Sequence, residues 1–181
     1  MRRLFIALFL LLAVASNGIA QQRSPVIVQL RGFDSPIRLE TVATWNDVLQ
    51  APGQAFTAVR RVVDSLEIPI AVADSARGLI HNPGFTARRN LAGKQMSRLI
   101  HCGMGVAGDY ADSYLITIAY AVMVDSLPDG HSRVGIAVVS NGRDVAGVST
   151  ETLMCGTTGS LEQTIIKAAQ LEMLKGRALA P

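Results

Sequence analysis

The sequence predicts an α+β domain in which an antiparallel β-sheet of about five strands packs against two main helices, an arrangement that resembles a helix grip. Two long apolar segments, 114–124 and 134–139, place larger and smaller side chains on alternate faces, are separated by a Pro-Asp-Gly turn and predict a long hairpin. Apolar residues recur at helical spacing over 56–66 and again after residue 160. Strands mixed with two helices in this order are typical of the α+β class.

Residues 1–20 have the features of a secretory signal peptide. Two arginines precede an apolar run over 4–14, and small residues at Gly18 and Ala20 fit a signal-peptidase site. The run is shorter than the roughly 20 apolar residues that a membrane-spanning helix needs. We therefore expect cleavage before Gln21, a periplasmic or secreted location, and no transmembrane span in the mature chain.

Loss of the leader changes the charge of the chain. The net charge falls from +3 to +1, because Arg2 and Arg3 are removed and no acidic residue is. A nearly neutral chain lacks the basic surface of nucleic-acid-binding proteins, so we expect no nucleic-acid partner. The remaining length fits one α+β domain over 37–176, with 21–36 as an N-terminal arm or edge strand and 177–181 as a tail.

The N-terminal part of the domain shows weaker patterns. Val26, Val28 and Leu30 alternate with other residues, which indicates an edge strand or an arm. Alternation over 37–42 predicts a half-buried strand, and 45–53 is interpreted as a connection that ends at a Pro-Gly pair.

The middle of the chain begins with the helix over 56–66, which cannot continue through Pro69. The segments 70–73 and 79–81 predict two paired strands, joined by a turn in which Gly78 is free to adopt a positive φ. The stretch 82–109 is irregular, with a short helix expected over 94–100.

The long hairpin has two apolar faces. Ile116, Ile118 and Tyr120 belong to the larger-residue face of its first strand, while Ala119 and Ala121 belong to a smaller-residue face, so both faces are expected to be covered. In the C-terminal helix, Ser160 and Gln163 predict a capping box. Its buried stripe is expected to consist of Leu161, Ile165, Ala168 or Ala169, and Leu171 or Glu172.

The two cysteines, Cys102 and Cys155, predict one disulfide, because an even number of cysteines in an exported protein favours pairing. The alternative is a catalytic thiol at Cys102 beside His101. Residues adjacent on a strand point to opposite faces, so this adjacency supports a catalytic pair only weakly.

Other candidate sites are less specific. His81, His101 and His131 have no metal-ligand spacing, and the Gly156–Ser160 stretch matches no phosphate-binding loop, so we expect no metal and no cofactor. A glycine-rich turn that positions Cys155 is the simpler interpretation of the second motif. A local basic cluster remains, which is either a solvated face or a contact for an anionic lipid or acidic partner; it consists of Arg88, Arg89, Lys94 and Arg98.

The stretch 56–80 contains the predicted helix, then Leu66-Glu67-Ile68-Pro69-Ile70, then Asp74 and Gly78. It resembles the helix-grip domains of the accessory lipoprotein of the bacterial outer-membrane β-barrel assembly machinery. The resemblance implies a sheet that grips a long C-terminal helix and a binding role in the cell envelope. The chain lacks that family's lipobox cysteine, so no functional residue is carried over. The segments around Cys102 and Cys155 also resemble those of secreted bacterial proteins.

The sequence therefore favours an exported, non-enzymatic binding or scaffold domain that acts on an envelope protein through a sheet edge or a helix groove. The alternative is a carrier that encloses a small molecule or lipid between sheet and helix. A hydrolase that uses Cys102 or a histidine–carboxylate pair is a third hypothesis, although the sequence contains no nucleophile elbow, zinc-protease helix or lactamase motif.

Overall fold

The structure is a computed structural model that describes residues 24–106 and 108–178. The predicted leader over 1–20 and the signal-peptidase site lie outside the described residues. None of the helices in the described ranges is long and apolar enough to cross a membrane.

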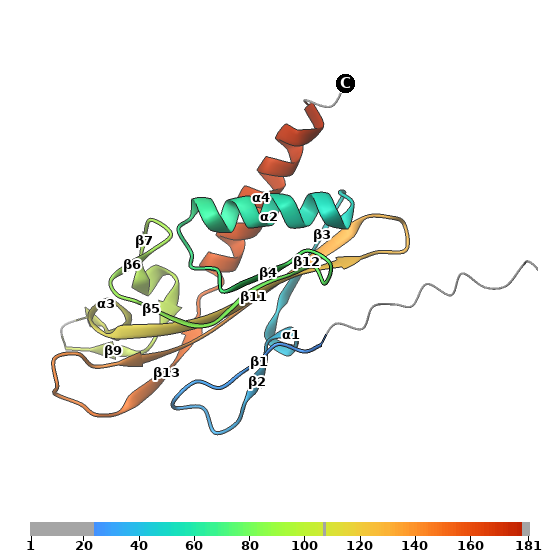
Figure 1. Ribbon diagram of the computed structural model, residues 1–181. Helices are drawn as coiled ribbons and strands as arrows, with labels where there is room; N and C mark the ends of the chain where they lie inside the picture. The colour runs from blue at the N-terminus through green and yellow to red at the C-terminus, as the bar shows by residue number, and fades with distance from the viewer. Residues whose placement is uncertain (1–23, 107, 179–181) are drawn as a thin grey trace, which may run out of the picture.

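The chain forms three layers (Figure 1), and the predicted α+β class is confirmed. Helices α2 (Pro52–Ser65) and α4 (Ser160–Ala178) cover one face of a seven-stranded antiparallel sheet, and the N-terminal segment covers part of the other face. Six strands of the sheet lie in the order β4 (Val72–Asp74), β5 (Leu79–Ala87), β11 (Leu115–Ser126), β12 (Ser132–Arg143), β13 (Thr152–Thr157) and β8 (Ile100–His101). The seventh strand, β3 (Thr44–Val48), pairs with the first half of β12, on the edge whose second half pairs with β13.

The predicted long hairpin forms the centre of this sheet. Strands β11 and β12 are fully paired, from Leu115 opposite Arg143 to Ser126 opposite Ser132. In the connecting turn, Gly130 has a φ of +82°, a conformation that glycine adopts without steric cost. The predicted 74–78 turn between β4 and β5 is also present, with Gly78 at a φ of +58°.

The helix side of the sheet contains the main core. The larger-residue face of β11 packs against α2 and α4. The buried apolar residues of α4 are Leu161, Ile165, Ile166, Ala169 and Met173. Of the predicted alternatives Leu171 and Glu172, Leu171 was wrong, because it is 61% exposed, whereas Glu172 is half-buried. The far end of α4 projects past the sheet (Figure 1). In this half of the helix the buried residues are Ala169 and Met173, which are four residues apart and therefore lie on the same face.

A polar node joins α2 to the sheet on this same side. The Tyr120 hydroxyl and the Asn82 side-chain amide both donate to the carbonyl oxygen of Pro69, at 3.1 and 3.0 Å. Burial raises the pKa of Tyr120, so the hydroxyl remains a donor. The carbonyl of Pro69, in the segment that follows α2, is thus the hydrogen-bond partner of both side chains.

The opposite face of the hairpin is covered by the N-terminal arm. In this arm, β1 (Ile27–Val28) pairs with β2 (Ile37–Arg38) in a separate two-stranded sheet. The buried cluster on this side consists of Val26, Val28, Leu30, Leu39, Leu79, Ala119, Ala121, Met123, Ala137 and Val139. The small alanines of the hairpin allow the arm to approach closely. The predicted coverage of both faces of the hairpin is confirmed.

Two predictions in the N-terminal part were wrong. The strand over 37–42 is only Ile37–Arg38, and the one-turn helix α1 (Leu39–Val42) follows, where the Thr41 hydroxyl donates to the carbonyl of Arg38. The expected connection over 45–53 contains β3 instead. Trp45 lies opposite Gly135 in β12, and an ideal Cβ on Gly135 would lie only 2.6 Å from the indole ring. The tryptophan therefore occupies the space that a side chain would need.

The irregular middle region also differs from expectation. The helix predicted over 94–100 is reduced to the 3-10 turn η1 (Met96–Arg98), because Asp112 accepts a hydrogen bond from the Ser97 amide at 2.8 Å. Cys155 and Gly156 lie inside β13 and not in a turn. The remaining short elements are β6 (Asn90–Leu91), β7 (Lys94–Gln95), β9 (Met104–Gly105), β10 (Gly108–Asp109) and α3 (Tyr110–Ser113).

Candidate functional site

The predicted disulfide is present. Cys102 and Cys155 are bonded, with a sequence separation of 53 residues, and link the segment after β8 to β13. Both residues are buried in the main core, at 7% and 6% exposure. Since the chain has only two cysteines, the bridge leaves no thiol for the catalytic alternative at Cys102.

Two of the histidines face carboxylates without forming a recognisable catalytic group. His101 Nδ1 lies 3.2 Å from Asp109 Oδ2, and His131 Nδ1 lies 3.0 Å from Asp129 Oδ2 in the β11–β12 turn. Asp109 also accepts the Ala111 amide at 2.9 Å, so it caps the short helix α3. Across the ranges 24–106 and 108–178, no three side chains of the metal-binding types come together.

His81 lies in β5 on the arm side of the sheet, and its Nδ1 is buried without a hydrogen-bond partner. Burial, with a smaller contribution from Arg77, lowers the pKa of His81 below 6.5. The unfolded chain therefore takes up the proton more readily, and stability that is present above the unfolded pKa is lost as the pH falls through it. We expect the free energy of unfolding to decrease between pH 7.5 and 5.5, and to decrease less in His81→Gln.

Urea titrations at the two pH values test this prediction, with His131→Gln in an exposed turn as the control. An equal pH dependence in the wild type and in His81→Gln would show that His81 is not the group responsible.

The four residues of the predicted basic cluster are distributed over separate elements. Lys94 lies in β7, and its Nζ donates to the Thr164 hydroxyl of α4 at 2.7 Å. Lys94 lines a hollow at the beginning of α4, and Arg88, Arg89 and Arg98 do not. Those three are exposed. Their contact with a lipid or an acidic partner stays a prediction.

The glycine-rich stretch before α4 satisfies its own amides. The Gly159 amide donates to the Thr157 hydroxyl at 3.0 Å, and the Ser160 amide donates to the Thr158 hydroxyl at 3.3 Å. The helix already includes Ser160, so the predicted capping box is replaced by these two threonines. This arrangement gives no support to a phosphate loop.

A more specific candidate lies between the start of α2 and the far end of α4. Here a surface hollow of about 340 Å³ opens between the two helices. Its lining residues are Gln50, Gly53, Gln54, Thr57, Ala58, Arg61, Glu172, Met173 and Gly176. The volume is in the range of pockets that bind small ligands or a few side chains. Arg61 Nη1 lies 3.9 Å from Glu172 Oε1, so this ion pair connects the two walls.

Gln50 is the unusual residue of this hollow. It is only 8% exposed, and its carbonyl accepts a hydrogen bond from the buried Ser132 hydroxyl, which fixes its backbone to β12. No hydrogen bond joins its side-chain amide to any residue that the structure describes. The amide atoms are not among the fully buried atoms without a partner, so they remain accessible and are available to a ligand.

A second hollow, of about 360 Å³, lies on the other side of Gln50, between β3 and α4. Leu49 and Leu174 line it and are 68% and 58% exposed. Gln50 is shared by both hollows, so apolar and polar surface continues from one to the other past the end of α4.

Sequence reasoning missed this site. Gln50 lies in a stretch that was interpreted as a connection, and a single polar residue there has no periodicity that could reveal burial. Its role becomes visible only when α4, more than a hundred residues later, is placed over it. No protein-family model matches the chain, and no curated protein matches it in sequence.

Proposed function

We propose that this chain is an exported, non-enzymatic binding domain of the bacterial cell envelope, which holds an extended segment of an envelope protein in the hollow beside Gln50. The observation that carries the proposal is the side-chain amide of Gln50, which belongs to a largely buried residue on the wall of the hollow, forms no hydrogen bond with any described residue and stays accessible to solvent. A ligand whose polar groups pair with this amide gains hydrogen bonds that the protein does not make there by itself.

The chemistry of an amide supports a peptide ligand. A glutamine side chain offers one carbonyl acceptor and one NH₂ donor, which match the N–H and C=O of a single peptide unit. The second hollow carries the exposed Leu49 and Leu174, and the first adds Ala58 and Met173 to its lining. A segment with an apolar side chain on each side of its paired peptide unit fits such a surface.

The carrier alternative has less support. Phe56, Ile116 and Ile165, which would surround a cavity between sheet and helices, are buried in a single cluster at 5%, 0% and 1% exposure. The space beneath the helices is thus filled by side chains, whereas the hollows beside Gln50 are open at the surface.

The helix-grip comparison is part of the same proposal. The packing of helix α4 against α2, with contacts to β12 and β3, supports this part of the proposal. Export is supported by the leader-like residues 1–20 and by the disulfide, which persists in oxidising compartments.

A site-specific crosslink tests the proposal. A photo-reactive phenylalanine placed at Gln54, on the wall of the hollow, is expected to capture one envelope protein through a defined peptide segment in intact cells. The same group at Arg88, which lies outside the hollow, is the matched control. Equal adducts from the two positions, or none from Gln54, would contradict the proposal.

The captured segment is then made as a synthetic peptide and titrated by fluorescence anisotropy. Gln50→Leu removes the amide at similar volume, and we expect affinity to fall about tenfold, which corresponds to about 1.4 kcal/mol. Gly176→Trp leaves Gln50 intact and fills the hollow, since a Cβ there meets no atom within 4 Å. Unchanged affinity in both variants would exclude this hollow as the peptide site.

A further inference from the structure

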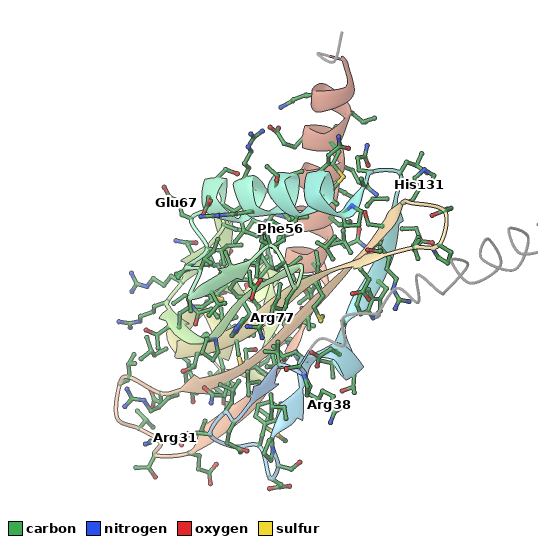
Figure 2. The ribbon with its side chains drawn as sticks, turned by 45° about the vertical axis from the view of Figure 1, so that its right-hand side comes forward. Arg31, Arg38, Phe56, Glu67, Arg77 and His131 are labelled. Atoms are coloured by element: carbon green, nitrogen blue, oxygen red, sulfur yellow. A yellow bond between two sulfur atoms is a disulfide. The ribbon has the colours of Figure 1, made fainter. Side chains whose placement is uncertain are left out.

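A third hollow lies on the opposite face of the sheet, where the N-terminal arm ends. Its volume is about 520 Å³, and it is enclosed by the tip of the arm and by strands β5, β11, β12 and β13. Two arginines, Arg31 of the arm and Arg143 of β12, line it together with short polar side chains. Figure 2 shows Arg31 at the end of the molecule that is remote from α2.

The charge in this hollow is positive. None of its lining residues is acidic, and neither arginine forms an ion pair with any described residue. The acidic residues next to the two strand ends, Asp144 and Glu151, are not among the residues that line the hollow. Asp144 is also occupied by its own loop and accepts the Val148 and Ser149 amides at 2.9 Å.

Arg31 is held in place by buried structure. Asn141 is 5% exposed, and its side-chain amide donates to the carbonyl oxygen of Arg31 at 2.8 Å, across 110 residues of sequence. The next residue, Gly32, has a φ of +85° and lies so close to β13 that an ideal Cβ would be 3.1 Å from the Thr152 carbonyl oxygen. The arm tip is thus docked on the sheet before any ligand arrives, which reduces the entropic cost of binding.

The floor of the hollow carries hydroxyl groups. Thr86, Thr117 and Asn141 are aligned across three neighbouring strands, and Thr152 lies opposite Arg143. The hydroxyls of Thr86, Thr117 and Thr152 form no hydrogen bond with the part of the chain that the structure describes. Donors are therefore available on the floor between two cationic walls.

We propose that this hollow binds a phosphate monoester or diester group, with Arg31 and Arg143 as its charge partners and the threonine hydroxyls as further donors. Guanidinium groups bind phosphate oxygens through paired hydrogen bonds. The hollow is much larger than one phosphate, so the group is carried by a larger polar ligand, either a soluble phosphate ester or a phospholipid headgroup. The site is independent of Gln50 and lies on the other side of the sheet.

Two probes distinguish these sources. Glycerol 3-phosphate is titrated by calorimetry, and vesicles of phosphatidylglycerol are compared with vesicles of phosphatidylcholine by co-sedimentation. Arg31→Gln and Arg143→Gln are each expected to weaken binding at least fivefold, and the double variant to abolish it. Arg88→Gln, an exposed arginine outside the hollow, is the matched control and is expected to bind like the wild type.

Each outcome decides the proposal. Arginine-dependent binding of glycerol 3-phosphate supports a soluble ester, and arginine-dependent binding only to phosphatidylglycerol supports a lipid headgroup. No binding to either probe, or binding that the double variant and Arg88→Gln reduce equally, overturns it. Thermal melts of the variants provide the folding check. Because both arginines are exposed and unpaired with any described residue, their melting temperatures are expected to match the wild type.

Discussion

Replacing Cys102 and Cys155 together by alanine is expected to lower the free energy of unfolding by about 4 kcal/mol on the chain-entropy description of disulfides. The bridge closes a loop with a sequence separation of 53 residues, which restricts the unfolded chain strongly. It also lies in the core, where Gly142 leaves room for it: an ideal Cβ on Gly142 would be 3.3 Å from the Cys155 sulfur. Without the bridge, the short strand β8 keeps its two-residue pairing with β13 and the burial of Ile100 in the core.

Urea unfolding without reductant measures this loss, with the slope fitted separately for each protein because the unfolded chain expands when the crosslink is removed. The wild type unfolded with excess reductant is the matched control, and its stability is expected to approach that of the double variant. A loss below about 1 kcal/mol in both would show that native contacts, and not the crosslink, hold β8 on β13. Under conditions where the double variant is folded, it is expected to keep the peptide affinity of the Gln50 hollow, which lies outside the crosslinked region.

The elements that could be predicted from the sequence are those whose partners are close in the chain. The β11–β12 hairpin has twelve residues in each strand and a short turn, so its alternation and its pairing are both local. Helix α2 has an apolar stripe that is interrupted by charges and ends before Pro69. For these segments periodicity and turn chemistry agree, and such agreement specifies structure well.

The missed strands depend on pairing over long distances. In β3, polar Asn46 and Asp47 break the apolar pattern, and the strand is stabilised by β12 and by the fit of Trp45 over Gly135. Strand β13 carries threonines and a glycine and obtains its place from β12 and the disulfide. Local propensity is weak in both, so tertiary context determines the structure.

Both candidate sites share this property. Gln50 is enclosed only because α4 crosses the segment after β3, and Arg31 meets Arg143 only because Asn141 and Gly32 dock the arm on the sheet. The basic cluster found in the sequence was selected by proximity in the chain, whereas the arginine pair in the hollow is separated by more than a hundred residues. Proximity in sequence was therefore a poor guide to proximity in space.

The second large effect concerns the arm. Leu39→Ala is expected to cost about 2–5 kcal/mol, because this side chain is fully buried in the cluster between the arm and the small-residue face of the hairpin. Val42, three residues later in the same short helix, is 49% exposed, and Val42→Ala is expected to change stability by less than about 0.5 kcal/mol. Urea unfolding of the two variants gives the difference directly.

The same pair of variants tests how the arm positions Arg31. Leu39 and Val28 pack the arm onto the hairpin. Under conditions where Leu39→Ala is still folded, the loss of this packing is expected to weaken phosphate binding in the hollow that Arg31 lines. Peptide binding beside Gln50 is expected to be unchanged, because that site lies on the helix side of the sheet. Equal phosphate affinity in Leu39→Ala, Val42→Ala and the wild type would mean that Asn141 alone is sufficient to position the arm tip.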